Sequence, residues 1–504
     1  MNKKVKLILK ILVSVAVIAA VAVGGVLGYS AYAQKGDLKI TVDKAKTLNK
    51  FEGFGASACW WAQYCANSEA QDEVTRLLYS KEGLALNVFR YNIGGGEADN
   101  PERTIQNDWR ATESFYVFNE QTDEYEYDFT RDANAQRILE LALSYETVDT
   151  VVLFANSPHF SMTASGKASG GDEESVSNLP RENYEKYAEY FLTITQYFID
   201  KGVPVKYISP VNEPQWGWGG PNAGQEGCHY EDEEIYELYR VFAKAIKARN
   251  MSVKLSAPES GNIGDTTKRW ISALYNDAEV REVLGTVSYH SYWADDYVSK
   301  KSEFGKWLGE NVPDISVEMS EWCHLPCTSS VEDISGALIQ ARVIANDLEY
   351  TGVNSWSAWV GVNQTGTGED GKNYSDGLLY ANDDFSEYGV AMRYYAMAHF
   401  SKFIPAGSVR LDTQKNLFDI KLKYSDGEIK TIYTSNTVSF LTPDGKVVTV
   451  VVNEGAQRML SVDVDASKMT VYTTTQEKQL ENTYSGELKT VTIPQNSITT
   501  LVFE

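Results

Sequence analysis

The sequence predicts an α/β protein built from a (β/α)8 TIM barrel and a C-terminal all-β sandwich. Three observations lead to this prediction. Short apolar segments alternate with amphipathic helical patterns over residues 51–400, eight such segments occur, and helical periodicity disappears in residues 401–504. An open doubly wound sheet is the alternative, but no glycine-rich phosphate-binding loop follows the first strand. At 504 residues the chain has room for a barrel and a smaller domain.

The eight predicted barrel strands are short and mostly apolar, as expected of strands that are buried on both faces. In chain order they are Glu52–Ser57, Asn87–Asn92, Thr150–Asn156, Lys206–Asn212, Val253–Ala257, Thr286–Tyr292, Ile315–Glu321 and Val353–Ser357. Helical patterns lie between them, for example Asn183–Lys201, which stops at Gly202. A barrel of this kind carries its active site at the carboxyl ends of the strands.

Residues 401–504 are expected to form the sandwich, because apolar and polar residues alternate there and turn signals separate the strands. Two of these signals are Ser425-Asp426-Gly427 and Pro443-Asp444-Gly445. Residues 38–50, ahead of the barrel, contain an early strand, Leu38–Val42. We expect this strand to pair with the sandwich.

Residues 1–33 have the layout of an export signal or a membrane anchor. Three lysines precede the apolar run Ile11–Tyr29, and Ala31-Tyr32-Ala33 then offers a small-x-small cleavage site. The run is long enough to span a bilayer if it stays uncleaved. The expected location is therefore outside the cell or attached to the outer face of the cell membrane.

Composition narrows the range of partners. The net charge of −23 disfavours nucleic acid, and the 31 Tyr and 11 Trp supply rings that suit carbohydrate. The cysteine and histidine spacings fit no standard zinc site, so we expect no metal. We also expect that the protein uses no cofactor and is a monomer. A local disulfide Cys323–Cys327 is expected, and five unpaired thiols are the alternative. The five cysteines are Cys59, Cys65, Cys228, Cys323 and Cys327.

Two glutamates follow barrel strands in positions that suit catalysis. Glu213 follows the fourth strand in the stretch SPVNEPQW, and Glu321 ends the seventh strand beside Trp322. Because both strand ends face one cavity, the carboxylates are expected to form the pair that retaining glycoside hydrolysis requires. Glu318, inside the seventh strand, is the rival nucleophile. The alternative is that either glutamate is a solvated or salt-bridged surface residue.

Further motifs surround the two glutamates. EGFGASACWW, FRYNIGGG, FANSPHFSMTASG and YHSYW occur in this order along the chain, with SPVNEPQW and VEMSEW. Together they resemble glycoside hydrolase family 30, and the resemblance covers nearly everything from residue 38 to 504. It implies a (β/α)8 barrel joined to a β-sandwich side domain, with paired glutamates on strands four and seven. It also implies a polysaccharide or oligosaccharide substrate.

Matched by position, the resemblance makes Glu213 the acid/base and Glu321 the nucleophile. Asn212 matches the residue that binds the sugar 2-hydroxyl, a contact that strengthens in the transition state. The alternative to an enzyme is a non-catalytic protein that uses the barrel only to bind carbohydrate. Both glutamates being intact argues against that hypothesis.

The resemblance also assigns residues around the pair. Arg90 matches an arginine that would keep the nucleophile ionised and its pKa low, while His290 and Tyr292 match polar groups near the same carboxylate. A buried structural ion pair is the compatible alternative for Arg90. Asn156, at the end of strand three, is expected to reach the sugar. The candidate sugar platforms at strand ends are Trp60, Trp61, Trp216, Trp218, Trp293, Trp322, Trp356 and Trp359.

The loop Gln215–Tyr230 bears on the choice of sugar. It most resembles members of the family that cut β-1,6-galactan, so an endo-β-1,6-galactanase is expected. Other specificities in the family stay open, namely β-1,6-glucanase, xylanase and β-glucosidase or glucosylceramidase. Transfer to acceptor sugars in place of water also stays open.

Overall fold

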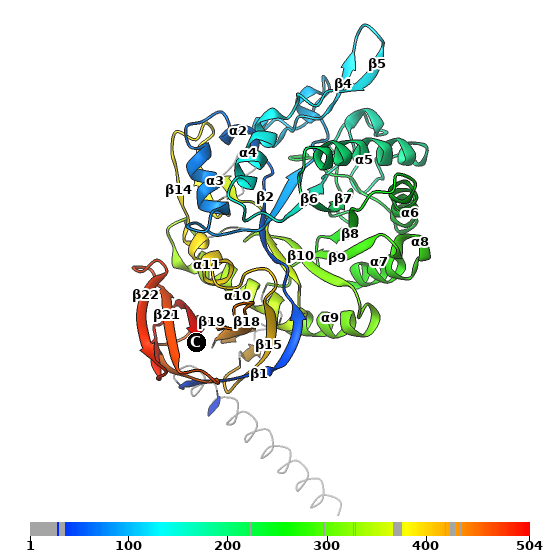
Figure 1. Cartoon of the computed structure of the whole chain (residues 1–504). Helices are drawn as coiled ribbons and strands as arrows, with labels where there is room; N and C mark the ends of the chain where they lie inside the picture. Colours follow the sequence, from blue (N-terminus) through cyan, green and yellow to red (C-terminus); the bar gives the residue numbers. More distant parts are fainter. Residues whose placement is uncertain are drawn as a thin grey trace, which may run out of the picture.

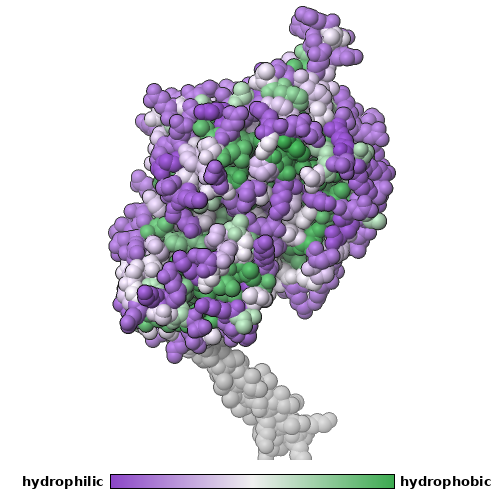
Figure 2. Space-filling model, in the orientation of Figure 1, coloured by the Kyte–Doolittle hydropathy of each residue, from purple (hydrophilic) through white to green (hydrophobic). Residues whose placement is uncertain are grey.

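The computed structural model describes residues 28–29, 36–221, 223–295, 298–325, 327, 329–365, 375–418, 420–423, 429–432 and 435–504. These residues form a barrel and a sandwich that lie one above the other (Figure 1). The face shown in Figure 2 is largely hydrophilic, with hydrophobic residues gathered over the middle of the barrel part and near its boundary with the sandwich. Within this described part, no helix has the length and apolar character needed to cross a membrane. The predicted export signal or anchor, residues 1–33, lies outside the described residues except for Gly28 and Tyr29.

Eight strands close into a parallel barrel in the spatial order β10-β11-β2-β3-β6-β7-β8-β9, which confirms the predicted fold class. In chain order they are β2 (Gly53–Ser57), β3 (Val88–Asn92), β6 (Thr150–Phe154), β7 (Val205–Ser209), β8 (Lys254–Ser260), β9 (Leu284–His290), β10 (Ser316–Trp322) and β11 (Ser355–Ala358). Strand β11 pairs with β2, with Ser355 opposite Gly53, and this pairing closes the ring.

Helices cover the outside of the barrel (Figure 1). They are α2 (Ala62–Cys65), α3 (Gln71–Tyr79), α4 (Ala133–Leu143), α5 (Tyr184–Asp200), α6 (Asp232–Ala248), α7 (Asp265–Asn276), α8 (Ala278–Arg281), α9 (Val298–Asn311), α10 (Ile334–Asn346) and α11 (Met392–Ser401). Local sequence explains their ends. Helix α6 starts with a capping box formed by Glu231 and Glu234. Helix α5 ends ahead of Gly202, whose φ of 81° lies in the left-handed region that glycine tolerates.

Small elements decorate the loops that connect barrel strands and helices. A hairpin of β4 (Tyr116–Asn119) and β5 (Glu124–Tyr127) projects at the top of Figure 1, far from the sandwich. Three short strands, β12 (Val362–Gln364), β13 (Leu379–Ala381) and β14 (Tyr388–Val390), form a separate sheet. The helical turns are η1 (Glu97–Asp99), η2 (Asp108–Arg110), η3 (Phe160–Met162), η4 (Arg181–Asn183) and η5 (Asp347–Thr351).

The fourth barrel strand ends earlier than predicted. Strand β7 stops at Ser209 rather than Asn212. Pro210 follows directly, and proline has no N–H with which to continue a ladder of hydrogen bonds. Glu213 therefore lies on a loop, and contacts of that loop rather than the sheet determine where its carboxylate points.

The sandwich is a nine-stranded sheet that curves around its own core, in the order β22-β21-β24-β19-β18-β15-β1-β20-β23, beside a hairpin of β16 and β17. The strands are β1 (Leu38–Lys50), β15 (Val409–Lys415), β16 (Ile420–Lys423), β17 (Ile429–Ile432), β18 (Asn436–Leu441), β19 (Val447–Asn453), β20 (Arg458–Asp463), β21 (Lys468–Thr474), β22 (Glu481–Glu487), β23 (Val491–Ile493) and β24 (Ser497–Phe503). Strand β1 runs antiparallel to β15 and parallel to β20, so a strand from before the barrel sits inside this sheet.

The predicted turn at Pro443-Asp444-Gly445 joins β18 to β19, and Gly445 has a φ of 85°. The other predicted turn, Ser425-Asp426-Gly427, lies outside the described residues. Strand β1 spans the whole predicted segment 38–50 and so continues past Val42, although its pairing with β15 is irregular after that residue.

Strand β19 packs against both parts of the protein. Val447 and Val451 point into the sandwich core, whereas Val448, Val450 and Val452 belong to the core shared with the barrel. This follows from the two-residue period of a strand. On the barrel side, α10 and α11 contact the sheet. An apolar layer therefore joins the two parts.

All five cysteines are buried and unpaired, so the predicted Cys323–Cys327 disulfide is wrong. The two thiols contact different partners. Tyr292 lies 3.5 Å from Sγ of Cys323, while Arg393 donates to Sγ of Cys327 over 2.9 Å. Close sequence spacing does not give the two sulfurs the geometry of a bridge.

Candidate active site

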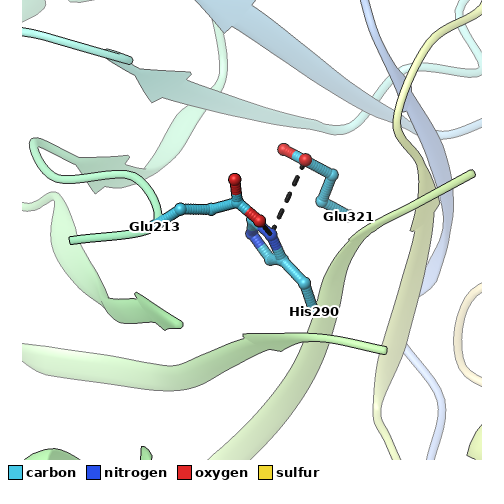
Figure 3. A group of neighbouring side chains, drawn as sticks. All are labelled: Glu213, His290 and Glu321. Atoms are coloured by element: carbon cyan, nitrogen blue, oxygen red, sulfur yellow. Dashed lines mark hydrogen bonds and ion pairs between the residues drawn. The ribbon is translucent and has the colours of Figure 1, made fainter. Parts of the chain in front are cut away.

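Two carboxylates meet over one histidine at the carboxyl end of the barrel. Oε1 of Glu213 lies 3.0 Å from Nδ1 of His290, and Oε1 of Glu321 lies 3.6 Å from the same nitrogen (Figure 3). A carboxylate oxygen of each glutamate lies within 4.8 Å of one from the other. Glu213 comes from the loop after β7, His290 ends β9 and Glu321 is next to last in β10. The structure thus brings together the pair that the strand-end argument predicted.

The loop after β7 holds Glu213 through its backbone. Its N–H donates to the carbonyl of Glu259 over 2.9 Å, and its own carbonyl accepts from the backbone of Trp216 and the indole of Trp218. The φ of Glu213 is 45°, in the left-handed region that is unfavourable for residues with a side chain. The surrounding hydrogen bonds therefore stabilise a backbone shape that turns the carboxylate toward His290.

A bulge in β10 places Glu321. The pairing with β9 shifts between Met319 and Glu321, so that Glu321 comes opposite His290. A bulge of this kind redirects the side chains that follow it. Glu318, the rival nucleophile, lies deeper in the barrel, where Oγ of Ser256 donates to it over 3.3 Å. The structure therefore places Glu321, rather than Glu318, beside Glu213.

The nucleophile candidate is surrounded by donors. Tyr292 donates its hydroxyl to Oε1 of Glu321 over 3.2 Å, and Nη1 of Arg90 lies 3.5 Å from Oε2. The sequence-based expectation that Arg90 keeps the pKa of Glu321 low is wrong. Burial raises that pKa to about 7, and the nearby charge of Glu213 adds to the rise, against the opposing effects of His290 and Arg90.

Burial and the neighbouring carboxylate of Glu213 thus keep a proton on Glu321 until the pH reaches about 7. Burial alone would lower the pKa of His290, but the charge of Glu321 and the hydrogen bonds of Glu213 and Glu259 raise it to about 10. At neutral pH the ring is therefore an imidazolium, which donates from both of its nitrogens.

Two protein-family models match this chain. The model for "O-Glycosyl hydrolase family 30" matches residues 37–380, and the model for the family's "beta sandwich domain" matches residues 407–501. This chain belongs to glycoside hydrolase family 30. It is accordingly an O-glycosyl hydrolase.

The family 30 enzyme is similar to curated proteins and to solved structures. An endo-beta-1,6-galactanase from Hypocrea rufa is 21% identical over 403 residues, which cover 75% of this chain and 77% of the relative. An exo-beta-1,6-galactobiohydrolase from Bifidobacterium longum is 23% identical over 373 residues, which cover 55% of this chain and 24% of that much longer protein. The crystal structure of a conserved exported protein from Bacteroides fragilis superposes with a TM-score of 0.78 at 24% identity, covering 92% of this chain and 100% of that one.

A third buried carboxylate supports the site of the family 30 enzyme, and it is not among the residues predicted from the sequence. Glu259, in β8, accepts from Nε2 of His290 over 3.1 Å and from Oγ of Ser209 over 2.9 Å. It also lies 3.8 Å from Nη2 of Arg90. Although burial opposes ionisation, Arg90 and His290 lower the pKa of Glu259 below its usual value. Its sequence signal was available, because Glu259 follows the predicted fifth strand as Glu213 follows the fourth.

Two asparagines predicted to reach the sugar lie beside the pair. Nδ2 of Asn212 donates to Oδ1 of Asn156 over 3.2 Å, and Nδ2 of Asn156 lies 3.4 Å from Oδ1 of Asn92. Within the described part of the chain, the amide oxygen of Asn212 is buried with no hydrogen-bond partner. Such an atom is costly to leave unsatisfied, and a substrate hydroxyl would satisfy it.

The tryptophans divide into two groups. Trp61, Trp322 and Trp356 were predicted to contact sugar, but the structure buries them with 0%, 1% and 0% of their surface exposed. Each indole N–H donates inside the protein, to the carbonyl of Ser57, to Asp295 and to Asp347 respectively. Their rings are structural because every face is covered. Trp60 and Trp359 are also buried, edge to face at 5.3 Å.

Trp216 and Trp293 are different. Their ring centroids lie 5.0 Å apart at the mouth of the site, and 66% of Trp293 is exposed. Contact of Trp216 with the substrate therefore stays a prediction, and Trp293 beside it has open aromatic surface.

A buried glutamate anchors the loop Gln215–Tyr230. Glu226 accepts from the backbone N–H of Gly95 over 2.9 Å and from the hydroxyl of Thr112, both in the segment after β3. Burial raises the pKa of Glu226 to about 7. Apart from residue 222, this loop is described by the structure, and Glu226 ties it to the segment after β3. The loop that is expected to select the sugar is therefore held in place by the buried hydrogen bonds of Glu226.

Glu213, His290 and Glu321 together offer three atoms close enough to surround a metal ion. The donor set does not fit that role. A histidine binds a metal through a deprotonated nitrogen. Both nitrogens of His290 instead face carboxylates, which raise its pKa to about 10. The arrangement suits proton transfer and charge stabilisation, and the expected absence of a metal or cofactor stays a prediction.

Proposed function

We propose that this family 30 enzyme hydrolyses β-1,6-galactan with retention of configuration, with Glu321 as the nucleophile and Glu213 as the acid/base. The observation that carries the mechanism is the separation of the two carboxylates, whose oxygens lie within 4.8 Å. Retaining enzymes hold their carboxyl groups about 5–5.5 Å apart, whereas inverting enzymes need about 6.5–9.5 Å to admit a water molecule. The separation of Glu213 and Glu321 is thus shorter than the one that an inverting enzyme needs.

In the first step, Glu321 attacks the anomeric carbon while Glu213 protonates the oxygen of the departing sugar. The glycosidic bond breaks as an ester bond to Glu321 forms. Arg90 and Tyr292 hold the attacking carboxylate through the contacts described above. For this step Glu213 must carry a proton and Glu321 must be ionised, and the imidazolium of His290 stabilises the ionised Glu321.

In the second step, Glu213 has lost its proton and acts as a base. It takes a proton from a water molecule, whose oxygen attacks the anomeric carbon and releases Glu321. Two displacements on opposite faces restore the β configuration. The unsatisfied amide oxygen of Asn212 is placed to accept from the sugar 2-hydroxyl during both steps.

Two lines of support favour galactan as the substrate. The two curated relatives named above are called a β-1,6-galactanase and a β-1,6-galactobiohydrolase. The loop Gln215–Tyr230, which resembles the galactan-cutting members, begins two residues after Glu213 and borders the site. A loop in that place contacts the sugars next to the bond that is cut.

A substrate panel tests this proposal. Purified enzyme would be incubated with β-1,6-galactan, arabinogalactan stripped of arabinose, β-1,6-glucan, xylan and glucosylceramide, and the products identified by linkage. Release of short β-1,6-galacto-oligosaccharides is expected, with Glu321→Gln as the inactive control. Cleavage only of another substrate would overturn the galactan assignment alone. Binding of these glycans without cleavage of any would favour the carbohydrate-binding alternative.

Proton NMR of the first minutes of reaction tests the stereochemistry separately. The β-anomer should appear first and then mutarotate. An α-anomer appearing first would contradict the retaining mechanism, whatever the substrate.

We also propose that the enzyme works outside the cell as a monomer, secreted or attached to the outer face of the membrane. The support is the layout of residues 1–33 and the size of a polysaccharide substrate, which does not cross a membrane unaided. Protease treatment of intact cells should remove the activity if the enzyme is attached outside. Activity confined to the cytoplasm after fractionation would contradict the proposal, and light scattering of the purified protein would test the monomer.

A further inference from the structure

One tryptophan beside the catalytic pair is both exposed and conformationally strained. Trp293 lies three residues after His290, which ends β9. With 66% of its surface exposed, it is the most exposed large hydrophobic side chain in the described part of the chain. Its φ of 57° is rare for a residue with a bulky side chain. A protein retains such an arrangement where function requires it.

Aromatic surface connects Trp293 to both glutamates. Its ring lies 5.0 Å from that of Trp216 and 5.9 Å from that of Tyr292. Tyr292 donates to Glu321, and the backbone N–H of Trp216 donates to the carbonyl of Glu213 over 3.1 Å. A sugar stacked on Trp293 would therefore be next to the catalytic pair.

Gly261, directly after β8, shows on which side of the pair this surface lies. A Cβ atom built on Gly261 would lie 2.6 Å from Oε1 of Glu213 and 2.3 Å from Nε1 of Trp216. The edge of the Trp216 indole therefore adjoins the carboxyl group of Glu213. Because the acid/base protonates the departing oxygen, the side chains around it border the departing sugar.

We propose that Trp216 and Trp293 form the subsite for the leaving-group sugar, with a neutral hexopyranose stacked on the exposed ring of Trp293. The inference rests on the proposed role of Glu213 as acid/base. Pyranose rings present C–H groups on one face, which pack on an indole, and their hydroxyl groups stay in water. A neutral sugar fits better than a uronic acid, because Glu213 and Glu321 lie next to the subsite and would repel a carboxylate.

The same subsite binds an acceptor sugar in the second step. A hydroxyl oxygen of the acceptor forms the new bond to the anomeric carbon, its proton passes to Glu213, and the ester bond to Glu321 breaks. An acceptor held on Trp293 therefore competes with water. Losing the ring should reduce transfer to sugars more than it reduces hydrolysis of a donor with an activated leaving group.

The test uses the full enzyme and whichever aryl β-glycoside from a galactoside, glucoside and xyloside panel it turns over. Free galactose and β-1,6-galactobiose serve as acceptors. The ratio of transfer to hydrolysis products would be measured for wild type, Trp293→Ala and Trp293→Tyr. Phe118→Ala is the matched control, because it removes another exposed ring, 49% exposed in β4. Thermal melting would verify that each variant is folded.

We expect Trp293→Ala to lower the transfer ratio about tenfold, the effect of a lost stacking contact of about 1.4 kcal/mol. Its kcat/KM on galacto-oligosaccharides should fall by a similar factor, and the rate on the aryl glycoside should fall less, because its activated leaving group departs with less help from the subsite. Trp293→Tyr should keep most of the transfer, and Phe118→Ala all of it. If Trp293→Ala leaves both the transfer ratio and the oligosaccharide kcat/KM unchanged, the subsite is wrong. Equal losses on aryl and oligosaccharide donors would also overturn it.

The outcomes separate this inference from the proposed function. If the enzyme turns over an aryl glucoside but not galactan, the proposed galactan specificity is wrong. The transfer ratios of wild type and Trp293→Ala still test the subsite in that case. An enzyme that turns over no β-glycoside overturns both, because the subsite depends on the acid/base role of Glu213.

Discussion

The carboxylate of Glu259 lies 3.1 Å from Nε2 of His290, so both nitrogens of this imidazole face carboxylates. Glu259 should therefore help to keep the ring protonated. In Glu259→Gln the amide can still accept from Ser209, but the negative charge is gone. We expect His290 to lose its proton well below pH 10, as followed by NMR of ¹⁵N-labelled imidazole. Glu259→Asp, which restores the charge, should recover part of the shift. An unchanged His290 titration would show that Glu259 has no such effect.

Glu226 should make the protein less stable as the pH rises. Burial raises its pKa from 4.5 to about 7, so the folded state binds its proton more tightly than the unfolded state does. This contribution is complete below about pH 4.5 and is lost as the pH rises through about 7, by up to about 3 kcal/mol. In urea unfolding, Glu226→Gln should lose less stability than wild type between pH 5 and 8. Parallel pH profiles for both proteins would contradict this prediction.

Replacing the nucleophile should leave a space that a small anion can use. Glu321→Ala should lose several orders of magnitude in kcat, since no ester can form. Azide or formate should restore part of the turnover of an activated aryl β-glycoside, and with azide the product should have the α configuration. Glu318→Ala is the comparison, because Glu318 lies deeper in the same strand. Rescue in Glu318→Ala together with an active Glu321→Ala would transfer the nucleophile role to Glu318.

Replacing the acid/base should affect substrates according to their leaving groups. Glu213→Gln should lower the rate on polysaccharide by about 10²–10⁴-fold, whereas an aryl glycoside with a good leaving group needs little protonation. Aryl release should then show a fast burst followed by slow turnover, since the second step still needs the base. Glu173→Gln, a change on an exposed loop, is the control. Equal losses on both substrate types would remove Glu213 from the acid/base role.

Gly261→Ala tests the space beside the acid/base. The added methyl group would meet Oε1 of Glu213 and Nε1 of Trp216 well inside van der Waals distance. Both side chains must move, and a displacement of about 1 Å at a catalytic group can cost about 10²-fold in rate. Activity should fall by about that factor, with little change in Tm. Gly264→Ala is the matched control, because its nearest neighbour, Oδ1 of Asn262, lies 3.1 Å away. Equal activities in the two variants would contradict the crowding argument.

Much of the site was predictable because it follows from the ends of apolar segments. A buried strand is a short apolar run, and in a parallel barrel the residue after each run reaches the same rim. Glu213 and Glu321 were predicted in this way, whereas Arg90 and His290 were assigned from the resemblance to family 30. Glu259 was not predicted because the fifth strand was expected to stop at Ala257, whereas it continues through the glutamate to Ser260.

The tryptophans and cysteines were not predictable in the same way. Whether the indole of Trp356 is covered depends on Asp347, on a helical turn that precedes its strand. The partner of Cys327 is Arg393, 66 residues away in the chain. Likewise, the bulge that turns Glu321 toward His290 is a property of the pairing between β9 and β10, which neither strand's composition reveals.

Strand β1 has a consequence for the order in which the protein folds. Its partners, β15 and β20, begin at Val409 and Arg458, so β1, the first of the described strands, stays unpaired until most of the chain has been synthesised. The barrel between them can form while β1 remains unpaired, with its edges open to other chains. Assembly of the sandwich is then the closing event. Truncation before β15 would leave β1 with neither of its partners and would expose the face of α10 and α11 that the sandwich covers. The C-terminal strands therefore contribute to the stability of a protein whose catalytic glutamates lie at the other end of the barrel.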